Sequence, residues 1–218
     1  MTFSILGRCT RTNQIGAASA SYFMAVGARV AFAEADTGAV LTQSRTDPRL
    51  GPMGLAMLRG GNSARATVDA LVAANRQAAW RQIAALDPKG GTAAYSGARA
   101  RGEVSEAATQ NAVAIGNTLS TARVPSAMLI SFQATAALPL SERLLQALEA
   151  GLAAGGDARA SRSARLLVVE RESFPLVDLR VDWHEQPIAE LRALWVRFAP
   201  LAAEMMTRAI DPEHASAL

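Results

Sequence analysis

Short apolar runs alternate with turn-forming residues along much of the chain, a pattern typical of antiparallel strands. Residues 3–7 form the first run, and the small residues of 15–23 predict its hairpin partner beyond the polar turn RTNQIG. A second hairpin is predicted over residues 28–43 and a third over 81–97, because ADTG and DPKGG favour tight turns. Further strands are predicted at residues 111–117, 164–173 and 175–183.

Helical patterns come in two pairs and one C-terminal stretch. The first helix is expected to begin near Pro52, since proline is favoured in a first helical turn, and Gly60 and Gly61 end it. The other predicted helices cover residues 62–77, 124–136, 139–157 and 188–209. Pro200 interrupts the last of them, because proline cannot continue the hydrogen-bond ladder of a helix.

The order of elements is strands, two helices, strands, two helices, strands and a tail. Residues 166–169 are apolar at every position, as in a strand that is covered on both faces. Two packed sheets with helices outside each satisfy this order, so we expect an α+β fold of four layers, an αββα sandwich. The alternative, a single sheet with helices on one side, would leave one helix pair without a partner face. We assign residues 1–182 to this domain and residues 183–218 to a C-terminal helical extension.

Composition and charge narrow the classes of function. The chain has 218 residues, of which 50% are apolar and 19% charged, as expected of a globular protein. The net charge is only +3 and no concentrated Lys/Arg run occurs, so no nucleic-acid partner is expected. No apolar stretch is long enough to span a membrane, and the opening residues lack the pattern of a signal peptide. Because Cys9 is the single cysteine, a reducing compartment is favoured and we expect a cytoplasmic protein.

Most of the common catalytic sets are missing from the sequence. The two histidines, His184 and His214, lie in a predicted surface turn and in the tail, which argues against a Ser-His-Asp triad. Two histidines and one cysteine give no zinc-binding pattern, so no metal site is predicted. No glycine motif for phosphate or dinucleotide binding occurs, so no cofactor is expected. Glu103 and Glu106 are interpreted as a solvated cluster in an Arg-rich loop.

The second residue offers a mechanism that needs no histidine. If Met1 is removed, Thr2 carries a hydroxyl nucleophile and a free α-amine a few bonds apart. The reference pKa of an α-amine is about 7.7–8.0, close to the value that suits a general base near neutral pH. The alternative at Thr2 is a structural role, as a β-forming residue that opens an edge strand.

Longer segments carry a family resemblance that covers nearly the whole chain. These segments are MTFSI, ASYFMAVGARV, GAVLTQSRTDPRLGPMGLAML, RQIAALDPKGGTAAYSG, IGN, LSERLLQALEAGLAAGGDAR and DLRVDWHEQPIAELRALW. In this order and spacing they resemble the DUF1028 family, an N-terminal-nucleophile (Ntn) hydrolase-like group. The resemblance implies an αββα sandwich of the Ntn type and an amide-hydrolase ancestry, with Thr2 as the catalytic nucleophile.

A nucleophile of this kind needs oxyanion donors and groups that orient the amine. We expect Asn117, which ends a predicted strand, to be the catalytic oxyanion donor, with a turn-forming role as the alternative. Ser21, Thr42 and Gln43 lie at strand ends that are expected to converge on the first strand, where they would orient the amine or the substrate, and we assign them to substrate binding. A purely structural place in the pleated strand is an equal alternative for Thr42.

Asp157 and Arg159, which follow the AGG turn, are also assigned to substrate binding, with a salt bridge at the helix end as the alternative. The expected substrate is a small-molecule or peptide-like amide, and the expected assembly is a homodimer or higher homo-oligomer. A non-catalytic binding or oligomeric scaffold is the main alternative function. A third interpretation is an enzyme that uses Asp157 or Glu34 as its acid or base.

Overall fold

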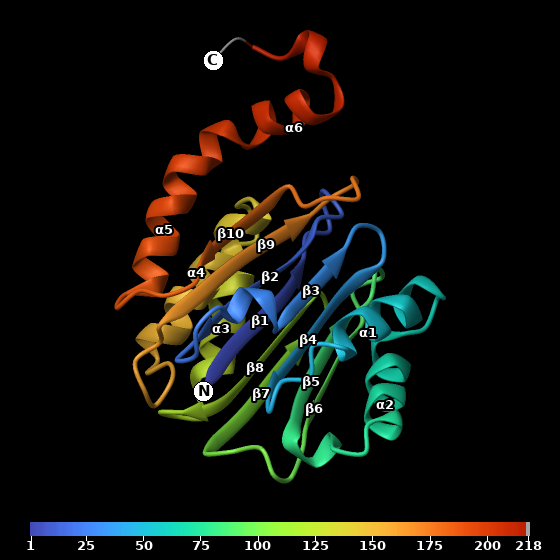
Figure 1. The fold of residues 1–218 in the computed structure, drawn as a ribbon, viewed down its shortest axis with the longest axis vertical. Helices are drawn as coiled ribbons and strands as arrows, with labels where there is room; N and C mark the ends of the chain where they lie inside the picture. Colours follow the sequence, from blue (N-terminus) through green and yellow to red (C-terminus); the bar gives the residue numbers. More distant parts are fainter. Residues whose placement is uncertain (217–218) are drawn as a thin grey trace.

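The computed structural model describes residues 1–216, so residues 217–218 of the predicted extension lie outside this description. Within the described chain the strands form two antiparallel sheets (Figure 1). The larger sheet has the order β10-β9-β2-β1-β8-β7, and the smaller has the order β3-β4-β5-β6. The strands are β1 (Thr2–Arg8), β2 (Ile15–Ser21), β3 (Ala31–Glu34), β4 (Gly38–Ser44), β5 (Arg81–Leu86), β6 (Thr92–Ser96), β7 (Glu103–Thr109), β8 (Ala112–Leu119), β9 (Ser163–Val169) and β10 (Val177–Val181).

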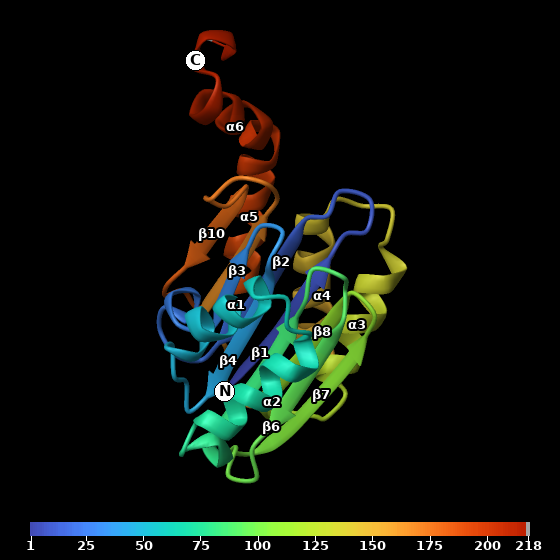
Figure 2. The same cartoon turned by 90° about the vertical axis from the view of Figure 1, so that its right-hand side faces the viewer.

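Helices cover the outer face of each sheet. Helices α1 and α2 pack on the smaller sheet, whereas α3 and α4 pack on the opposite side of the molecule, against the larger sheet (Figure 2). The α-helices are α1 (Leu50–Arg59), α2 (Ala64–Ala74), α3 (Val124–Ala134), α4 (Leu140–Ala153), α5 (Pro187–Phe198) and α6 (Ala202–Ile210). Short 3-10 helices are η1 (Val26–Ala28), η2 (Ala78–Trp80), η3 (Ala199–Leu201) and η4 (Pro212–His214).

Three apolar cores separate the four layers. Leu6 and Ile115 of the larger sheet meet Leu41 of the smaller sheet in the core between the sheets. Phe3 faces the other way, into the core under α3 and α4, because successive strand residues point to opposite faces. A third core lies under α1 and α2. The two antiparallel sheets between helices match the predicted α+β order of layers and exclude the single-sheet alternative.

Strand β9 illustrates why the sequence predicts this layering. All seven of its residues are buried, because β9 lies between β10 and β2 with a sheet on one face and helices on the other. Strand β7, in contrast, was expected to be a charged loop. Its register with β8 pairs Glu106 with Ile115, and its exposed side chains fit an edge strand, which has a neighbour on one side only. The first helix also begins at Leu50, two residues before the predicted Pro52.

The C-terminal stretch is divided at Pro200, as predicted, into α5 and α6 with η3 between them. Helix α5 buries Ile188 and Leu191 in the core beside the larger sheet, and Leu194, Trp195 and Phe198 pack against the same core. Helix α6 has no buried residue and extends beyond the sandwich (Figure 1). Among the described helices, none has both the length and the apolar character that a membrane crossing requires.

Candidate active site

Thr2 begins β1, which lies between β2 and β8 in the larger sheet. Ser21, the last residue of β2, pairs with Thr2 on one side, and Asn117 of β8 pairs with it on the other. Side chains of directly paired residues project from the same face of a sheet. Since Phe3 faces the helices, Thr2, Ser21 and Asn117 face the second sheet. The register therefore brings three of the predicted site residues together.

The hydroxyl groups of Thr2 and Ser21 converge on the carbonyl oxygen of Met1. Thr2 Oγ1 donates to that oxygen at 2.6 Å and Ser21 Oγ donates at 2.7 Å, while the two hydroxyl oxygens lie 3.0 Å apart. Ser21 Oγ accepts the backbone N–H of Phe23 at 3.1 Å, which leaves its own proton for the carbonyl. Thr2 is 6% exposed and Ser21 is 2% exposed, so both hydroxyls lie away from bulk water.

Three buried amide side chains hold this end of β1: Gln43 of β4, Gln82 of β5 and Asn117. Their orientation follows from backbone carbonyls, which only accept hydrogen bonds. Gln43 Nε2 donates to two carbonyls at 3.3 Å, and Gln82 Nε2 donates to the Gly116 carbonyl at 3.0 Å. Gln82 Oε1 therefore faces the other two amides, and it accepts from Gln43 Nε2 at 2.8 Å and from Asn117 Nδ2 at 3.2 Å.

Asn117 consequently presents its oxygen, and not its N–H, to the chain terminus. Asn117 Oδ1 accepts a hydrogen bond from the α-amine of Met1. This orientation does not support the predicted role of Asn117 as an oxyanion donor, because its amide nitrogen is turned toward Gln82. The groups that donate to the carbonyl oxygen of Met1 are the hydroxyls of Thr2 and Ser21.

Thr42 and Gln43 are neighbours in β4 and therefore point to opposite sides of the smaller sheet. Gln43 reaches the larger sheet, where Ser4 Oγ donates to its Oε1 at 2.8 Å. Thr42 pairs in register with Ile83, which faces α1 and α2, and its Oγ1 donates to the carbonyl of Asp47 at 3.3 Å. The structure thus brings Gln43 to the cluster at Thr2 and keeps Thr42 on the other face.

Asp157 approaches the N-terminus from the turn after α4. Gly155 has a φ of +123° in this turn, and a Cβ there would lie 2.2 Å from the Ser120 hydroxyl oxygen, so the turn requires glycine. The turn sets Asp157 beside Leu119, the last residue of β8. The backbone N–H of Tyr22, which follows β2, donates to Asp157 Oδ2 at 3.3 Å.

Arg159 lies close to Asp157 in sequence, but the two side chains form no ion pair in the described structure. The Arg159 guanidinium instead lies over the Tyr22 ring, 5.3 Å from its centroid. The salt bridge offered as the structural alternative for this pair is therefore not formed.

Burial changes the proton affinity of two groups at the site. It lowers the pKa of the Met1 α-amine, and the charge of Asp157 partly offsets that effect. It also raises the pKa of Asp157 to about 6, against the attraction of the α-amine. Burial thus biases the Met1 α-amine toward the neutral form, the form that a general base requires.

A cavity of about 580 Å³ lies beside these groups. Met1, Thr2, Ser21 and Asn117 contribute to its lining. The apolar side chains that line it include Phe23 and Met24, both of them exposed. The lining also includes four arginines: Arg29, Arg45, Arg81 and Arg101. The other predicted site residues, Thr42, Gln43, Asp157 and Arg159, are not part of it.

The remaining candidates lie away from this cluster. Arg59 Nε donates to Glu34 Oε1 at 2.8 Å, and this hydrogen bond lowers the pKa of Glu34, so Glu34 is a charged, paired carboxylate. His184 and His214 are exposed, and His214 contacts Asp211 at 2.8 Å. Within residues 1–216, no three His, Cys, Asp or Glu side chains are grouped so that they could hold a metal ion.

Two features of the site are not evident from sequence patterns. Gln82 connects the other two amides, and its signal is a polar residue directly before the apolar run IAAL of β5. A buried amide needs hydrogen-bond partners, so such a residue marks a place where strands meet other polar groups. The cavity arginines come from four separate segments, and only folding brings them together.

These features define an α+β protein of two packed antiparallel sheets, with a polar cluster and a cavity at the start of the strand β1. The family model described as "Family of unknown function (DUF1028)" matches residues 2–191. The chain therefore belongs to the DUF1028 family, which confirms the predicted resemblance.

A solved structure agrees with this assignment. The crystal structure of a DUF1028 protein from Silicibacter pomeroyi is 32% identical in sequence, with a TM-score of 0.85, and the match covers 91% of this chain and 86% of that chain. Anbu (ancestral beta-subunit) from Yersinia bercovieri aligns over 91% of this chain and 94% of that chain, at 10% identity and a TM-score of 0.41. This second likeness is too low to establish a shared fold. No curated protein matches the chain.

Proposed function

We propose that this protein is an amide hydrolase in which Thr2 Oγ1 acts as the nucleophile after Met1 is removed. The observation that carries the proposal is the convergence of the Thr2 and Ser21 hydroxyls on a carbonyl oxygen in the lining of a cavity of about 580 Å³. A cavity of this volume suits a small-molecule or peptide-like amide.

The layer order supports an αββα sandwich of the N-terminal-nucleophile type. Two sheets pack face to face between helices, and the proposed nucleophile begins a strand in the interior of the larger sheet. A nucleophile on a strand that has a neighbour on each side is held more rigidly than one on a loop, which favours catalysis.

In the first half of the reaction the amine of Thr2 is the base. It accepts the proton of Oγ1 as this oxygen attacks the amide carbon, and the electron pair of the carbonyl double bond moves to its oxygen. When the carbonyl re-forms, the C–N bond breaks, and the ammonium returns the proton to the departing nitrogen. The products are a free amine and an ester on Thr2.

The second half repeats these steps with water as the nucleophile. The amine of Thr2 takes a proton from water, whose oxygen attacks the ester carbon. The bond between that carbon and Oγ1 then breaks, and Oγ1 regains the proton. A carboxylic acid leaves and the enzyme is restored.

The neighbours of Thr2 have roles that follow from their hydrogen bonds. Ser21 already donates to a carbonyl oxygen, so it is the proposed donor to the developing oxyanion. When Met1 is removed, Asn117 Oδ1 loses its present donor, the α-amine of Met1. As an acceptor it then orients the Thr2 amine or the N–H of the substrate. Gln43 and Gln82 are positioning residues that hold Asn117 and the carbonyl of Thr2.

The test combines intact-mass measurement with hydrolysis of a panel of acyl p-nitroanilides. We expect the active protein to lack Met1, Thr2→Ser to keep part of the activity, and Thr2→Ala to lose it. The matched control is Thr10→Ala, because Thr10 is exposed in the turn between β1 and β2 and should leave activity unchanged. Activity in Thr2→Ala, or in protein that retains Met1, would refute the proposal.

A specific observation also favours the alternative of a non-catalytic scaffold. With Met1 in place, its α-amine and its carbonyl oxygen both have partners, so the cluster also anchors the start of β1. On this alternative, Thr2→Ala weakens folding and changes no reaction rate. The same variants therefore separate the two functions.

A further inference from the structure

The arginines of the cavity come from four places in the fold. Arg29 follows η1, Arg45 follows β4, Arg81 begins β5 and Arg101 precedes β7. Each of them lines the cavity that also contains Thr2, and no Asp or Glu of the described chain is part of this lining. The charged side chains in the lining of the candidate active site are therefore all positive.

Little of this charge is neutralised within the protein. Three of the four arginines form no ion pair with any residue from 1 to 216, and all three are exposed. The fourth, Arg81, approaches one carboxylate, with its Nη2 at 3.8 Å from Asp47 Oδ2. Asp47 is shared, because Arg49 Nη2 contacts the same oxygen at 2.8 Å.

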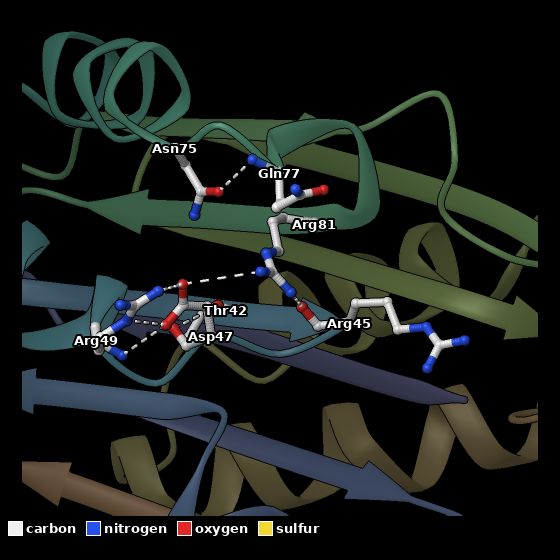
Figure 3. Close-up of polar contacts among 7 residues, drawn as sticks. All are labelled: Thr42, Arg45, Asp47, Arg49, Asn75, Gln77 and Arg81. Carbon is white, nitrogen blue, oxygen red and sulfur yellow. Dashed lines mark hydrogen bonds and ion pairs between the residues drawn. The ribbon is translucent and has the colours of Figure 1, made fainter.

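Arg81 is a fixed group at the edge of this region. Figure 3 shows its side chain extending from β5 toward Asp47 and the backbone of Arg45. Its Nη1 donates to the Arg45 carbonyl, and its side chain is only 15% exposed. The Nε of Arg81 is buried and has no hydrogen-bond partner among the described residues. An added acceptor near this guanidinium would therefore be favourable.

Arg45 extends the positive surface beyond the cavity. Its guanidinium points away from the Asp47 carboxylate in Figure 3 and lies 6.0 Å from the centroid of the Trp80 ring. Arg45 and Arg81 also line a neighbouring cavity together with Trp80 and Gln77. The two arginines thus connect the Thr2 cavity with an adjacent basic, aromatic surface.

Arginine is the side chain best suited to bind an oxyanion. Its planar guanidinium stays charged and donates two parallel hydrogen bonds to carboxylate or phosphate oxygens. Several guanidinium groups around one cavity repel one another, and a bound anion relieves that repulsion. A neutral ligand would leave the charges unpaired, so a cavity lined in this way favours an anionic ligand over a neutral one.

We propose that the substrate of the Thr2 site is an amide that also carries an oxyanion group, a carboxylate or a phosphate, which Arg29, Arg45, Arg81 and Arg101 bind. The identity of the ligand as an amide rests on the proposed hydrolase function. The binding of the anion does not, because it requires no reaction at Thr2.

Calorimetric titration of the full chain with glutarate, inorganic phosphate and glutaramide tests this proposal. We expect the better of the two anions to bind at least about tenfold more tightly than neutral glutaramide, since each arginine contributes charge-assisted hydrogen bonds. Tighter binding of glutarate identifies a carboxylate as the preferred group, and tighter binding of phosphate identifies a phosphoryl group. Added salt should weaken the binding of either anion, because it screens the charges of the arginines. Equal binding of all three probes would overturn the proposal.

Variants locate the anion site. The double variant Arg45→Gln/Arg101→Gln should weaken anion binding by about tenfold or more, because both side chains lack a competing carboxylate. Arg123→Gln, at an exposed arginine outside the cavity, is the matched control and should bind as the wild type does. Unchanged affinity in the double variant would refute the assignment.

The same titrations separate this proposal from the hydrolase mechanism. Thr2→Ala should retain anion binding, since the arginines are untouched, even though it removes the nucleophile. If anions bind but Thr2→Ala shows the same amide hydrolysis as the wild type, the hydrolase mechanism fails and the anion site stands. If Thr2 is required for hydrolysis but neutral and anionic probes bind equally, the anion site fails.

Discussion

Replacing Gln82 by leucine tests whether the buried amides hold the start of β1. Gln82 is fully buried and links the two sheets, since Asn117 Nδ2 donates to its Oε1 and its Nε2 donates to the carbonyl of Gly116. Leucine has a similar volume but no hydrogen-bonding atoms. The variant therefore removes polar contacts while leaving the packing almost unchanged.

The magnitude follows from the groups that lose a partner. Asn117 Nδ2 and the carbonyl of Gly116 both lose a buried hydrogen bond to Gln82, and each such loss costs about 1–3 kcal/mol. The apolar side chain of leucine offsets about 1–2 kcal/mol of this sum. Two losses of about 2 kcal/mol each, less about 1.5 kcal/mol for the leucine side chain, give an expected fall of about 2–3 kcal/mol in the free energy of unfolding, a large part of the stability of a typical domain.

Urea unfolding followed by circular dichroism measures this change, with Gln133→Leu as the control. Gln133 is exposed on α3 and its side chain forms no hydrogen bond with any residue from 1 to 216, so its replacement should change stability by less than about 0.5 kcal/mol. The double variant Gln43→Leu/Gln82→Leu should cost less than the sum of the single variants, because the two amides share a hydrogen bond. If Gln82→Leu is no more destabilising than Gln133→Leu, the amide chain does not hold β1.

Three further predictions concern other contacts. Asp157→Asn should flatten the pH dependence of stability. Burial raises the pKa of Asp157 from 3.8 to about 6, so the contribution of this carboxyl group to stability falls as pH rises through that interval. Urea titrations at several pH values measure this change. Glu142→Gln should lower stability by about 1 kcal/mol in chemical unfolding, because Glu142 joins α4 to Arg192 and Trp195 of α5, and an undiminished stability would contradict that role. Truncation after Leu201 should lower the melting temperature, measured by calorimetry, by less than about 2 °C, because α6 has no buried residue. A larger drop would show that α6 supports the sandwich.

The sequence predicts the strongly patterned parts of this fold. Strand β9 was recognisable because its residues 166–169 are all apolar, and the β3–β4 hairpin because its turn has Asp36 and Gly38, which tolerate positive φ. Strand β7 escaped recognition because its alternation is weak and its outer side chains include Glu103 and Glu106. Pairing with β8, a tertiary effect, makes this segment a strand.

The site was predictable only in part, for similar reasons. Strand ends suggested that Ser21, Gln43 and Asn117 would approach Thr2, and the register brings them there. Alternation along β4 means that Thr42 and Gln43 cannot both face the same sheet, a constraint that strand ends alone do not express. The donor or acceptor role of Asn117 depends on Gln82, whose partners are distant in sequence.

Covalent trapping of the 218-residue protein tests directly whether Thr2 is the nucleophile. A β-lactone, which acylates activated hydroxyl groups, would be added to active protein, and the modified residue would be found by peptide mapping with mass spectrometry. The account predicts one acyl group on the hydroxyl of Thr2, in an N-terminal peptide that begins at Thr2. An adduct at another residue, or active protein whose first peptide still carries Met1, would contradict it.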